Sequence, residues 1–247
     1  MSKSMKTKKI GFSKFGGIFI GELESSKLHQ HTAITVALSL NGRFKFENEK
    51  QTIHTSGVIS QPNSYRRYVS NPNNILAFVH IEPLCAIGLP ILDKTTPHHL
   101  LSAKQIMIIT DALKNWYKEP GDLEKATRVT IECIAEQIAP EGTTRRIDSR
   151  IQKTIDLIWS SERVTLKELA GTVGLSTYRL SHLFKDETGM SFKAYLLHRK
   201  LVKSMREIVL EQETLSSSAY AGGFSDQAHF NRTFLNAFGV TPNNSIR

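Results

Sequence analysis

The sequence predicts an α+β protein in which a small β-rich unit and two helices precede an all-helical C-terminal part. Three observations predict this class. Apolar residues alternate with a period of two between about residues 15 and 82, they recur with helical spacing after Pro97, and a helix-turn-helix pattern occurs twice after residue 150. A chain of 247 residues is long enough for two modest domains, each with its own core.

The N-terminal part has the alternation of half-buried strands. The stretch "TAITVALSL" places four apolar side chains on one face, namely Ile34, Val36, Leu38 and Leu40. An Asn-Gly pair at 41–42 then leads into "RFKF", which indicates a hairpin because both turn positions of this pair accept positive φ. Further short apolar runs lie at 51–54, 57–60, 65–69 and 74–81. This pattern predicts a small barrel or sandwich.

Two amphipathic helices are expected next, at 102–117 and 122–138, with "EPGD" between them and Asp122 as an N-cap. Each carries an apolar stripe that either packs on the β-rich unit or mediates self-association. The stripes are Ile106, Ile109, Leu113 and Trp116, and Ile131, Ile134 and Ile138. The polar stretch "APEGTTRRIDSR" that follows is the candidate linker.

Composition indicates a globular, cytoplasmic protein with no membrane partner. The chain is 40% hydrophobic and 22% charged, and it has no apolar run long enough to span a bilayer. Cys85 and Cys133 lack metal-ligand spacing and suit free thiols in a reducing compartment. The basic start lacks the cleavage site of a signal peptide, so a solvated basic tail is expected there.

The net charge of +9 is distributed unevenly along the chain. Residues 1–9 carry four positive charges, residues 10–142 carry 13 charges of each sign, and residues 143–247 carry 15 positive and 10 negative charges. The C-terminal part is therefore basic, which favours a polyanionic partner.

An internal repeat lies within this basic part. "TLKELAGTVGLS" at 165–176 aligns with "TLSSSAYAGGFS" at 214–225, and five of the twelve positions are identical. Each copy is typical of a helix, a tight turn and a second helix. In the first copy Thr165 and Glu168 form a capping box and Ser176 caps the second helix, whereas in the second copy Asp226 is the cap. The buried faces are Leu180, Leu183 and Phe184, and Phe230 and Phe234.

The opposite faces of the two second helices carry short polar side chains near the caps. Such faces are either merely solvated or suited to reading base edges in a major groove, and their occurrence twice in a basic region favours DNA. Between the copies, residues 191–212 are expected to form a helix. Because a helix of about 20 residues spans roughly 30 Å, it would place the two copies about one DNA turn apart.

These motifs carry a resemblance to a known family. "LKELAGTVGLSTYRLSHLFKDETGMSFKAYLLHRKL" and "GGFSDQAHFNRTFLNAFGVTP" resemble the tandem helix-turn-helix domain of AraC/XylS bacterial transcription regulators. The resemblance implies base contacts by Tyr178, Ser181 and His182 in the first copy, and by Gln227, Ala228, Asn231 and Arg232 in the second. Phosphate contacts are expected from Lys167, Lys185 and Arg179, and from Arg145 and Arg146. Two departures stand out: Ser218 occupies a usually apolar position, and Ser245–Ile246 replaces a usual Tyr-Arg.

The resemblance extends more weakly to residues 15–140, which are similar to a cupin-like sensor and dimerisation domain. It implies a homodimer, and it leaves RNA polymerase open as a further partner. The candidate effector pocket comprises Val36, Leu38, Arg66 and His31. From the residues alone, the strand face with Val36 and Leu38 either lines a pocket or fills the core, and Arg66 and Arg67 either bind an anionic effector or lie on the barrel rim.

The full expectation is a sequence-specific DNA-binding regulator, not an enzyme, with an effector-sensing barrel. The expected segments are a basic tail (1–14), the sensor domain (15–140), a linker (141–150) and the DNA-binding domain (151–247). Two alternatives remain: a ligand-independent regulator whose barrel only dimerises, and a metal-dependent cupin enzyme. His29, His31, His54 and His80 offer too few correctly spaced ligands, so no metal and no cofactor are expected. No nucleophile triad or acid/base carboxylate pair is evident.

Overall fold

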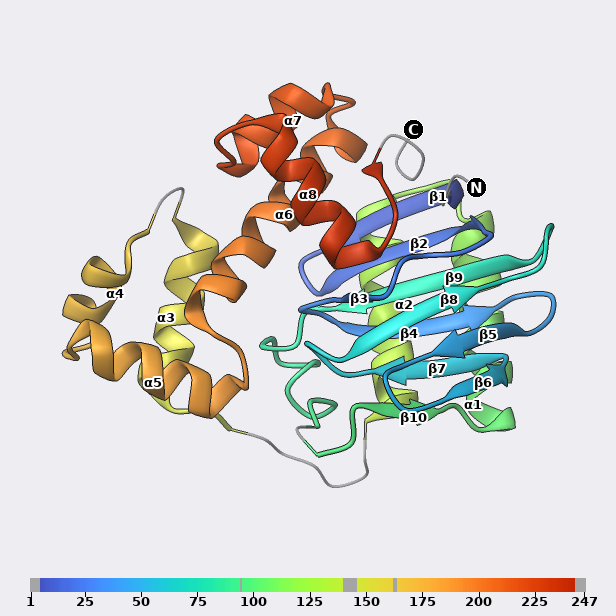
Figure 1. The fold of residues 1–247 in the computed structure, drawn as a ribbon, viewed down its shortest axis with the longest axis horizontal. Coiled ribbons are helices and arrows are strands. Elements are labelled where there is room, and N and C mark those ends of the chain that lie inside the picture. The colour runs from blue at the N-terminus through green and yellow to red at the C-terminus, as the bar shows by residue number, and fades with distance from the viewer. Residues whose placement is uncertain (1–4, 94, 140–145, 162–163, 243–247) are drawn as a thin grey trace.

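The computed structural model describes residues 5–93, 95–139, 146–161 and 164–242. The N-terminal part is a β-sandwich domain backed by two helices, and the C-terminal part is all-helical (Figure 1). The predicted α+β class is confirmed. Within the described residues the strands form two sheets and not one closed barrel.

The larger sheet has six antiparallel strands. In spatial order they are β1 (Met5–Ser13), β2 (Gly16–Leu23), β9 (Ile75–Ile81), β4 (Ile34–Ser39), β7 (Gly57–Ser60) and β10 (His98–Leu100). The smaller sheet contains β3 (His29–Gln30), β8 (Tyr65–Val69), β5 (Phe44–Glu47) and β6 (Thr52–Thr55). Because side chains alternate along a strand, the two faces of the larger sheet pack against different layers.

One face of the larger sheet packs against α1 (Ala103–Lys118) and α2 (Leu123–Ile138), which lie behind it in Figure 1. Val36 and Leu38 belong to this layer, together with Ile109, Leu113 and other apolar residues of the two helices. Both helices therefore bury their stripes on the sheet, and Asp122 caps α2 as expected. The other face meets the smaller sheet, with Ala37 and Phe78 opposite Phe44, Phe46 and Tyr68.

The prediction of a solvated tail for residues 1–14 is wrong for residues 5–13, which form strand β1. Phe12 is buried in the sandwich interior. Lys9 is held by the end of α1, where its Nζ donates to the carbonyl oxygens of Trp116 at 2.8 Å and Glu119 at 2.9 Å. Helix C-termini leave carbonyl groups unpaired, so a basic residue there has a structural role.

Six helices follow: α3 (Ser149–Ser160), α4 (Leu166–Thr172), α5 (Thr177–Thr188), α6 (Phe192–Leu210), α7 (Leu215–Gly222) and α8 (Gln227–Phe238). Of the expected linker at 141–150, residues 141–145 lie outside the described part of the chain and Ser149 already begins α3. No helix in the described ranges is long and apolar enough to cross a membrane. Cys85 and Cys133 are free thiols, as expected.

The helical part packs on the β-sandwich domain at two places. The core of α3 and α5 continues into the loop after β9 through apolar residues such as Leu84 and Ile91. The core of α6, α7 and α8 continues into the space between the two sheets. Just after α8, the Lys27 amide donates to the Gly239 carbonyl at 2.8 Å. A backbone hydrogen bond therefore also links the end of α8 to the β-sandwich domain.

Candidate DNA-reading surface and interdomain cavity

Helices α4 and α5 form a first reader unit, and α7 and α8 form a second. The same turn bond closes both units: the Leu175 amide donates to the Ala170 carbonyl, and the Phe224 amide donates to the Ala219 carbonyl, each at 2.9 Å. The expected caps are all present, namely the Thr165–Glu168 capping box, Ser176 and Asp226. The repeated sequence therefore folds into two copies of one local structure.

In each unit the buried face of the second helix orients the polar face outwards. Leu180 and Phe184 of α5 and Phe230 and Phe234 of α8 are all fully buried, as predicted. Because residues three or four apart share one helix face, the intervening positions must point away from this core.

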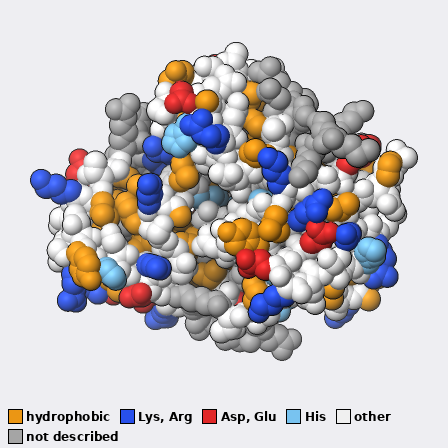
Figure 2. Space-filling view, in the orientation of Figure 1, with side chains coloured by type: hydrophobic (Ala, Val, Ile, Leu, Met, Phe, Trp, Pro, Cys, Tyr) orange, Lys and Arg blue, Asp and Glu red, His pale blue; other side chains and the backbone are white. Residues whose placement is uncertain are grey.

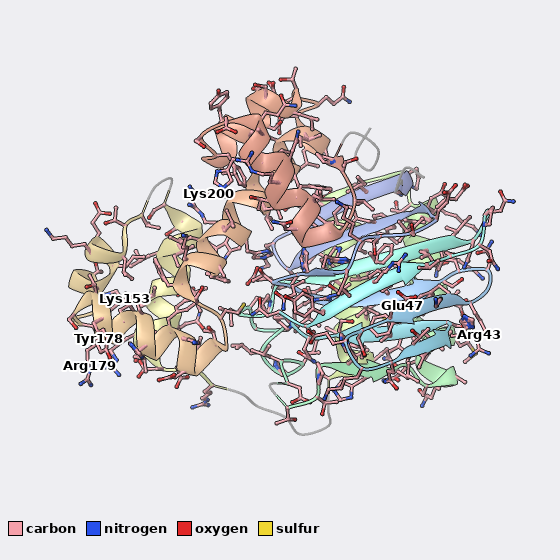
Figure 3. All side chains as sticks on the ribbon, in the orientation of Figure 1. Arg43, Glu47, Lys153, Tyr178, Arg179 and Lys200 are labelled. Atoms are coloured by element: carbon pink, nitrogen blue, oxygen red, sulfur yellow. The ribbon has the colours of Figure 1, made fainter. Side chains whose placement is uncertain are left out.

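The outward face of α5 contains the three expected base-reading residues. Tyr178 is 70% exposed, and its ring packs against that of His182 with the centroids 4.3 Å apart. Ser181 is half-buried beside them. Figure 3 shows Tyr178 and Arg179 on the side of α5 that faces away from the β-sandwich domain. This face presents an aromatic ring, an imidazole and a guanidinium to solvent.

The outward face of α8 is smaller. Ala228 and Arg232 are exposed, whereas Gln227 and Asn231 are half-buried. The Oδ1 atom of Asn231 is buried and has no hydrogen-bond partner among the described atoms. Asp226 caps the helix through the His229 amide at 2.7 Å, and this bond lowers the pKa of the Asp226 carboxyl.

Exposed cations surround the first unit. Lys167, Arg179 and Lys185 are all exposed, as phosphate contacts require, and Arg146 is exposed before α3. Arg145 lies outside the described residues. The sequence analysis did not single out Lys153, which is an exposed cation on α3, the helix that packs against α5 (Figure 3). Helix spacing alone could have placed it there.

Ser218 lies at the packed contact between α6 and α7. Its side chain is fully buried, and neither its hydroxyl nor that of Ser204 on α6 has a hydrogen-bond partner among the described atoms. A buried hydroxyl without a partner is unfavourable. This agrees with the expectation that serine at position 218 weakens the packing of the second unit.

A cavity of about 460 Å³ lies between the β-sandwich domain and the helical part, and we call it the interdomain cavity. Phe12 and Phe19 line it from the sheet, and Phe238 lines it from α8. Charged side chains also line it, namely the cations Lys14, Arg199, Lys203 and Arg206 and the carboxylate of Glu82. Figure 2 shows hydrophobic side chains on both sides of a hollow between the two parts, with histidine side chains deep within it.

A hydrogen-bond network crosses this boundary. The Glu82 carboxylate, just after β9, accepts a bond from the Tyr195 hydroxyl at 2.9 Å and lies 3.0 Å from His198 Nε2. The Trp159 indole donates to the Tyr195 hydroxyl at 2.8 Å. Burial and the neighbouring Glu82 carboxylate raise the pKa of Tyr195 well above its ordinary value. Sequence reasoning missed these residues because no local pattern joins them.

His31 and His80 lie at the inner wall of the interdomain cavity, with their rings stacked 4.4 Å apart. Burial lowers the pKa of both well below 6.5, and neighbouring histidines and Arg66 add to the effect. Both rings are therefore neutral at neutral pH. Within the described ranges, no group of three or more His, Cys, Asp or Glu side chains is arranged to hold a metal ion.

The structure separates the four candidate effector-pocket residues. Val36 and Leu38 are wrong as pocket residues, because they face α1 and α2 and fill the core there. Arg66 and His31 lie on the other side, between the sheets and the helical part. The barrel-rim alternative is wrong for Arg66, which is only 1% exposed, whereas Arg67 pairs with Glu47 at 3.0 Å near the surface.

Comparisons with known proteins agree with this architecture. Residues 169–247 match a family model described as a helix-turn-helix domain. The probable transcriptional regulator LumQ of Photobacterium leiognathi is 22% identical over 89% of this chain and 91% of its own length. The transcriptional activator RhaS of Pectobacterium carotovorum is 33% identical over 33% of this chain, but the match covers only 29% of RhaS.

Solved structures show the same fold along the whole chain. ToxT of Vibrio cholerae superposes with a TM-score of 0.61 and 9% identity over all of both chains. A ToxT structure with a bound unsaturated fatty acid gives a TM-score of 0.56 and 10% identity over 98% of this chain and 95% of that one.

Fold and surface together define a β-rich part followed by a helical part that contains two helix-turn-helix units. Residues 169–247 therefore belong to a helix-turn-helix domain family, and the chain is similar to DNA-binding transcription regulators.

Proposed function

We propose that the chain binds double-stranded DNA by inserting α5 and α8 into the major groove. Tyr178, Ser181 and His182 would contact bases from the first unit, and Gln227, Ala228, Asn231 and Arg232 from the second. The observation that carries the proposal is the repeated local structure, in which two buried apolar faces orient two polar faces outwards. Lys167, Arg179 and Lys185 would hold the phosphates beside the first unit.

The helix α6 supports this geometry. It has 19 residues and is therefore about 28 Å long, close to one turn of B-DNA. Two readers joined by such a helix can reach neighbouring segments of groove on one face of a duplex.

Selection from a pool of random-sequence duplexes tests the DNA proposal. The double variant His182→Ala, Arg232→Ala is expected to bind the selected duplex about thirtyfold more weakly or worse, because two base contacts of about 1–3 kcal/mol each are lost together. Arg43→Ala, His54→Ala removes the same residue types from exposed positions of the β-sandwich domain and should leave binding unchanged. Equal binding by both double variants would contradict the assignment.

We further propose that a small amphipathic acid in the interdomain cavity modulates DNA binding. Aromatic side chains and cations line the same space, which suits an apolar body and an acidic head. ToxT, which has the same fold, has been solved with an unsaturated fatty acid and with a naphthalenyl butenoic acid. A ligand there would contact both domains, and it would therefore favour one arrangement of the two reader units relative to the β-sandwich domain.

Oleate, with oleyl alcohol as its uncharged analogue, is the probe for this second proposal. Oleate is expected to bind the full chain and to change its affinity for the selected duplex, whereas the alcohol should bind at least tenfold more weakly. Lys203→Met should weaken oleate binding, and Lys153→Met, which replaces an exposed lysine on α3 outside the cavity, should not. Failure of oleate to bind would favour a regulator whose β-sandwich domain only dimerises.

A homodimer and a contact with RNA polymerase stay as predictions. Met107 of α1 and Val129 of α2 are exposed apolar residues on the helices that back the larger sheet, and they are candidates for self-association. Sedimentation of Met107→Glu against wild type would test the dimer.

A further inference from the structure

The two reader units differ in the cations that their own helices supply. Lys167, Arg179 and Lys185 lie within the first unit, whereas residues 214–242 of the second unit contain only Arg232. Arg232 is exposed on the outward face of α8, where a base contact is proposed for it. Contacts with phosphates fix the position of a protein on a duplex, and cations make the strongest of them. The second unit therefore lacks a cation of its own for the DNA backbone.

The helices α3 and α6 support the two units in the same way. Each buries one stripe of residues against its unit, and the two stripes are 50 positions apart in the chain. They are Ile151, Thr154, Ile155 and Ile158 in α3, and Leu201, Ser204, Met205 and Ile208 in α6. The position just before each stripe is a cation, Arg150 in α3 and Lys200 in α6. The repeat therefore includes a supporting helix with a cation at an equivalent place.

The two equivalent cations differ in their partners. Arg150 Nη2 lies 2.6 Å from an Asp148 carboxylate oxygen. Among the described residues, no Asp or Glu forms an ion pair with Lys200. The other cations between residues 199 and 206 of α6 are engaged elsewhere: Arg199 donates to the Ser161 carbonyl, Arg206 lies 3.7 Å from Glu124, and Lys203 lines the interdomain cavity. Lys200 thus keeps its charge available for a partner outside the fold.

The stem of Lys200 packs against the turn of the second unit. Gly223 forms this turn with a φ of 89°, and a Cβ built on it would lie 3.6–3.9 Å from Cγ, Cδ and Cε of Lys200. A Cβ on the equivalent Gly174 of the first unit would meet nothing within 4 Å. Because a lysine can lay its methylene groups on a surface while its ammonium stays in water, Lys200 supplies a charge beside the turn.

This position suits a contact with the DNA backbone. Lys200 is not among the residues of α6 that line the interdomain cavity, and Figure 3 shows it on the side of α6 that faces away from the β-sandwich domain. Four residues after Gly223 the chain reaches Gln227, the first proposed reading position of α8. In helix-turn-helix complexes the second helix enters the major groove by its N-terminal residues and the first helix crosses the backbone. A cation at the turn between them is therefore within reach of a phosphate.

We propose that Lys200 binds a DNA phosphate beside the second reader unit, so that α6 supplies the backbone contact for which α7 and α8 have no cation. The inference rests on the proposed function, because it requires that α8 reads the major groove. An ammonium is a compact charge with three donors, which suits a phosphate oxygen. The helix α6 then faces DNA with Lys200 and the interdomain cavity with Lys203, so a ligand that shifts α6 would also shift this phosphate contact.

Ethylation interference on the selected duplex tests the proposal, because it identifies each phosphate whose modification weakens binding. The positions at which His182→Ala and Arg232→Ala relax base preference show which end of the duplex each unit occupies. Lys200→Gln is expected to remove interference at a phosphate beside the second unit and to reduce the slope of log K against log salt by about 0.9. Lys200→Arg keeps the charge and should retain both the interference and the slope.

Lys114→Gln is the matched control, because it removes an exposed lysine from the middle of α1 and should change neither quantity. Lys200→Gln should leave the Tm unchanged. If it lowers the Tm, Lys200→Met, which keeps most of the stem, should show the same two losses.

An unchanged slope and interference pattern in the Lys200 variants would overturn the proposal. Loss of interference only beside the first unit would overturn it as well. In both cases Arg232→Ala can still weaken binding, which would leave the proposed reading by α8 intact. A wild-type chain that binds no duplex would instead overturn the proposed function together with this inference.

Discussion

The Glu82 carboxylate and the His198 imidazole are hydrogen-bonded across the boundary between the two domains, with 3.0 Å between Oε2 and Nε2. Both side chains are buried, and 116 positions separate them in the chain. The pair joins the end of β9 to the middle of α6, the helix between the two reader units. The pair therefore attaches the β-sandwich domain to the helix that sets the distance between the two units.

Glu82→Gln should lower the free energy of unfolding by about 1–3 kcal/mol, because it weakens two buried hydrogen bonds to a charged acceptor. Denaturant unfolding measures the effect. Glu132→Gln is the control, since Glu132 pairs with Arg128 on the surface of α2 and such pairs contribute at most about 1 kcal/mol. Equal losses in the two variants would show that the Glu82 contacts do not stabilise the fold.

Gly222→Ala should destabilise the second reader unit by about 1–3 kcal/mol through overpacking. A Cβ at this position would lie 1.9 Å from Ser204 Oγ and 2.8 Å from the Lys200 carbonyl. Gly171→Ala is the matched control, because a Cβ there meets nothing within 4 Å and alanine favours the helix. Thermal unfolding should show a lower Tm for the first variant and an equal or higher Tm for the second.

Stability should fall on acidification because of the buried histidines. The folded pKa of His29, about 3, lies below its ordinary value of 6.5, so the unfolded chain binds the extra proton first. The stability that neutral His29 contributes to the folded state is fully present above pH 6.5, and it is lost as the pH falls towards the folded pKa. The slope is about 1.4 kcal/mol per pH unit for each such histidine.

Urea unfolding between about pH 6.5 and about pH 4 measures this slope. His29→Asn should reduce it, whereas His54→Asn, on an exposed position of β6, should leave it unchanged. A slope that does not differ between wild type and His29→Asn would contradict the assignment of His29 as a buried neutral ring.

Arg179→Ala should make DNA binding less dependent on salt. Each phosphate contact that is lost reduces the slope of log K against log salt by about 1. The affinity should fall by a similar factor for specific and random duplexes, because phosphates carry no sequence information. Lys50→Ala, an exposed lysine of the β-sandwich domain, should change neither quantity. A selective loss on the specific duplex would instead assign Arg179 to base reading.

The helical part was predictable because its signals are local. Caps such as Thr165, Ser176 and Asp226 act within one helical turn, and the buried positions of α5 and α8 follow from the period of 3.6 residues. The repeat then predicted two reader units. Strand β1 was missed because its lysines indicated solvent, whereas Lys9 is held by the distant end of α1.

By itself, the sequence determined the α+β class, the two helix-turn-helix units and the residues on their outward faces, because strand alternation, helix periodicity and capping depend on neighbours within a few positions. Only the tertiary structure decided which sheet face Val36 and Arg66 occupy, and that Glu82 meets His198. Those relationships depend on how distant segments pair and pack, and alternation along a strand cannot tell which of its two faces meets the helices.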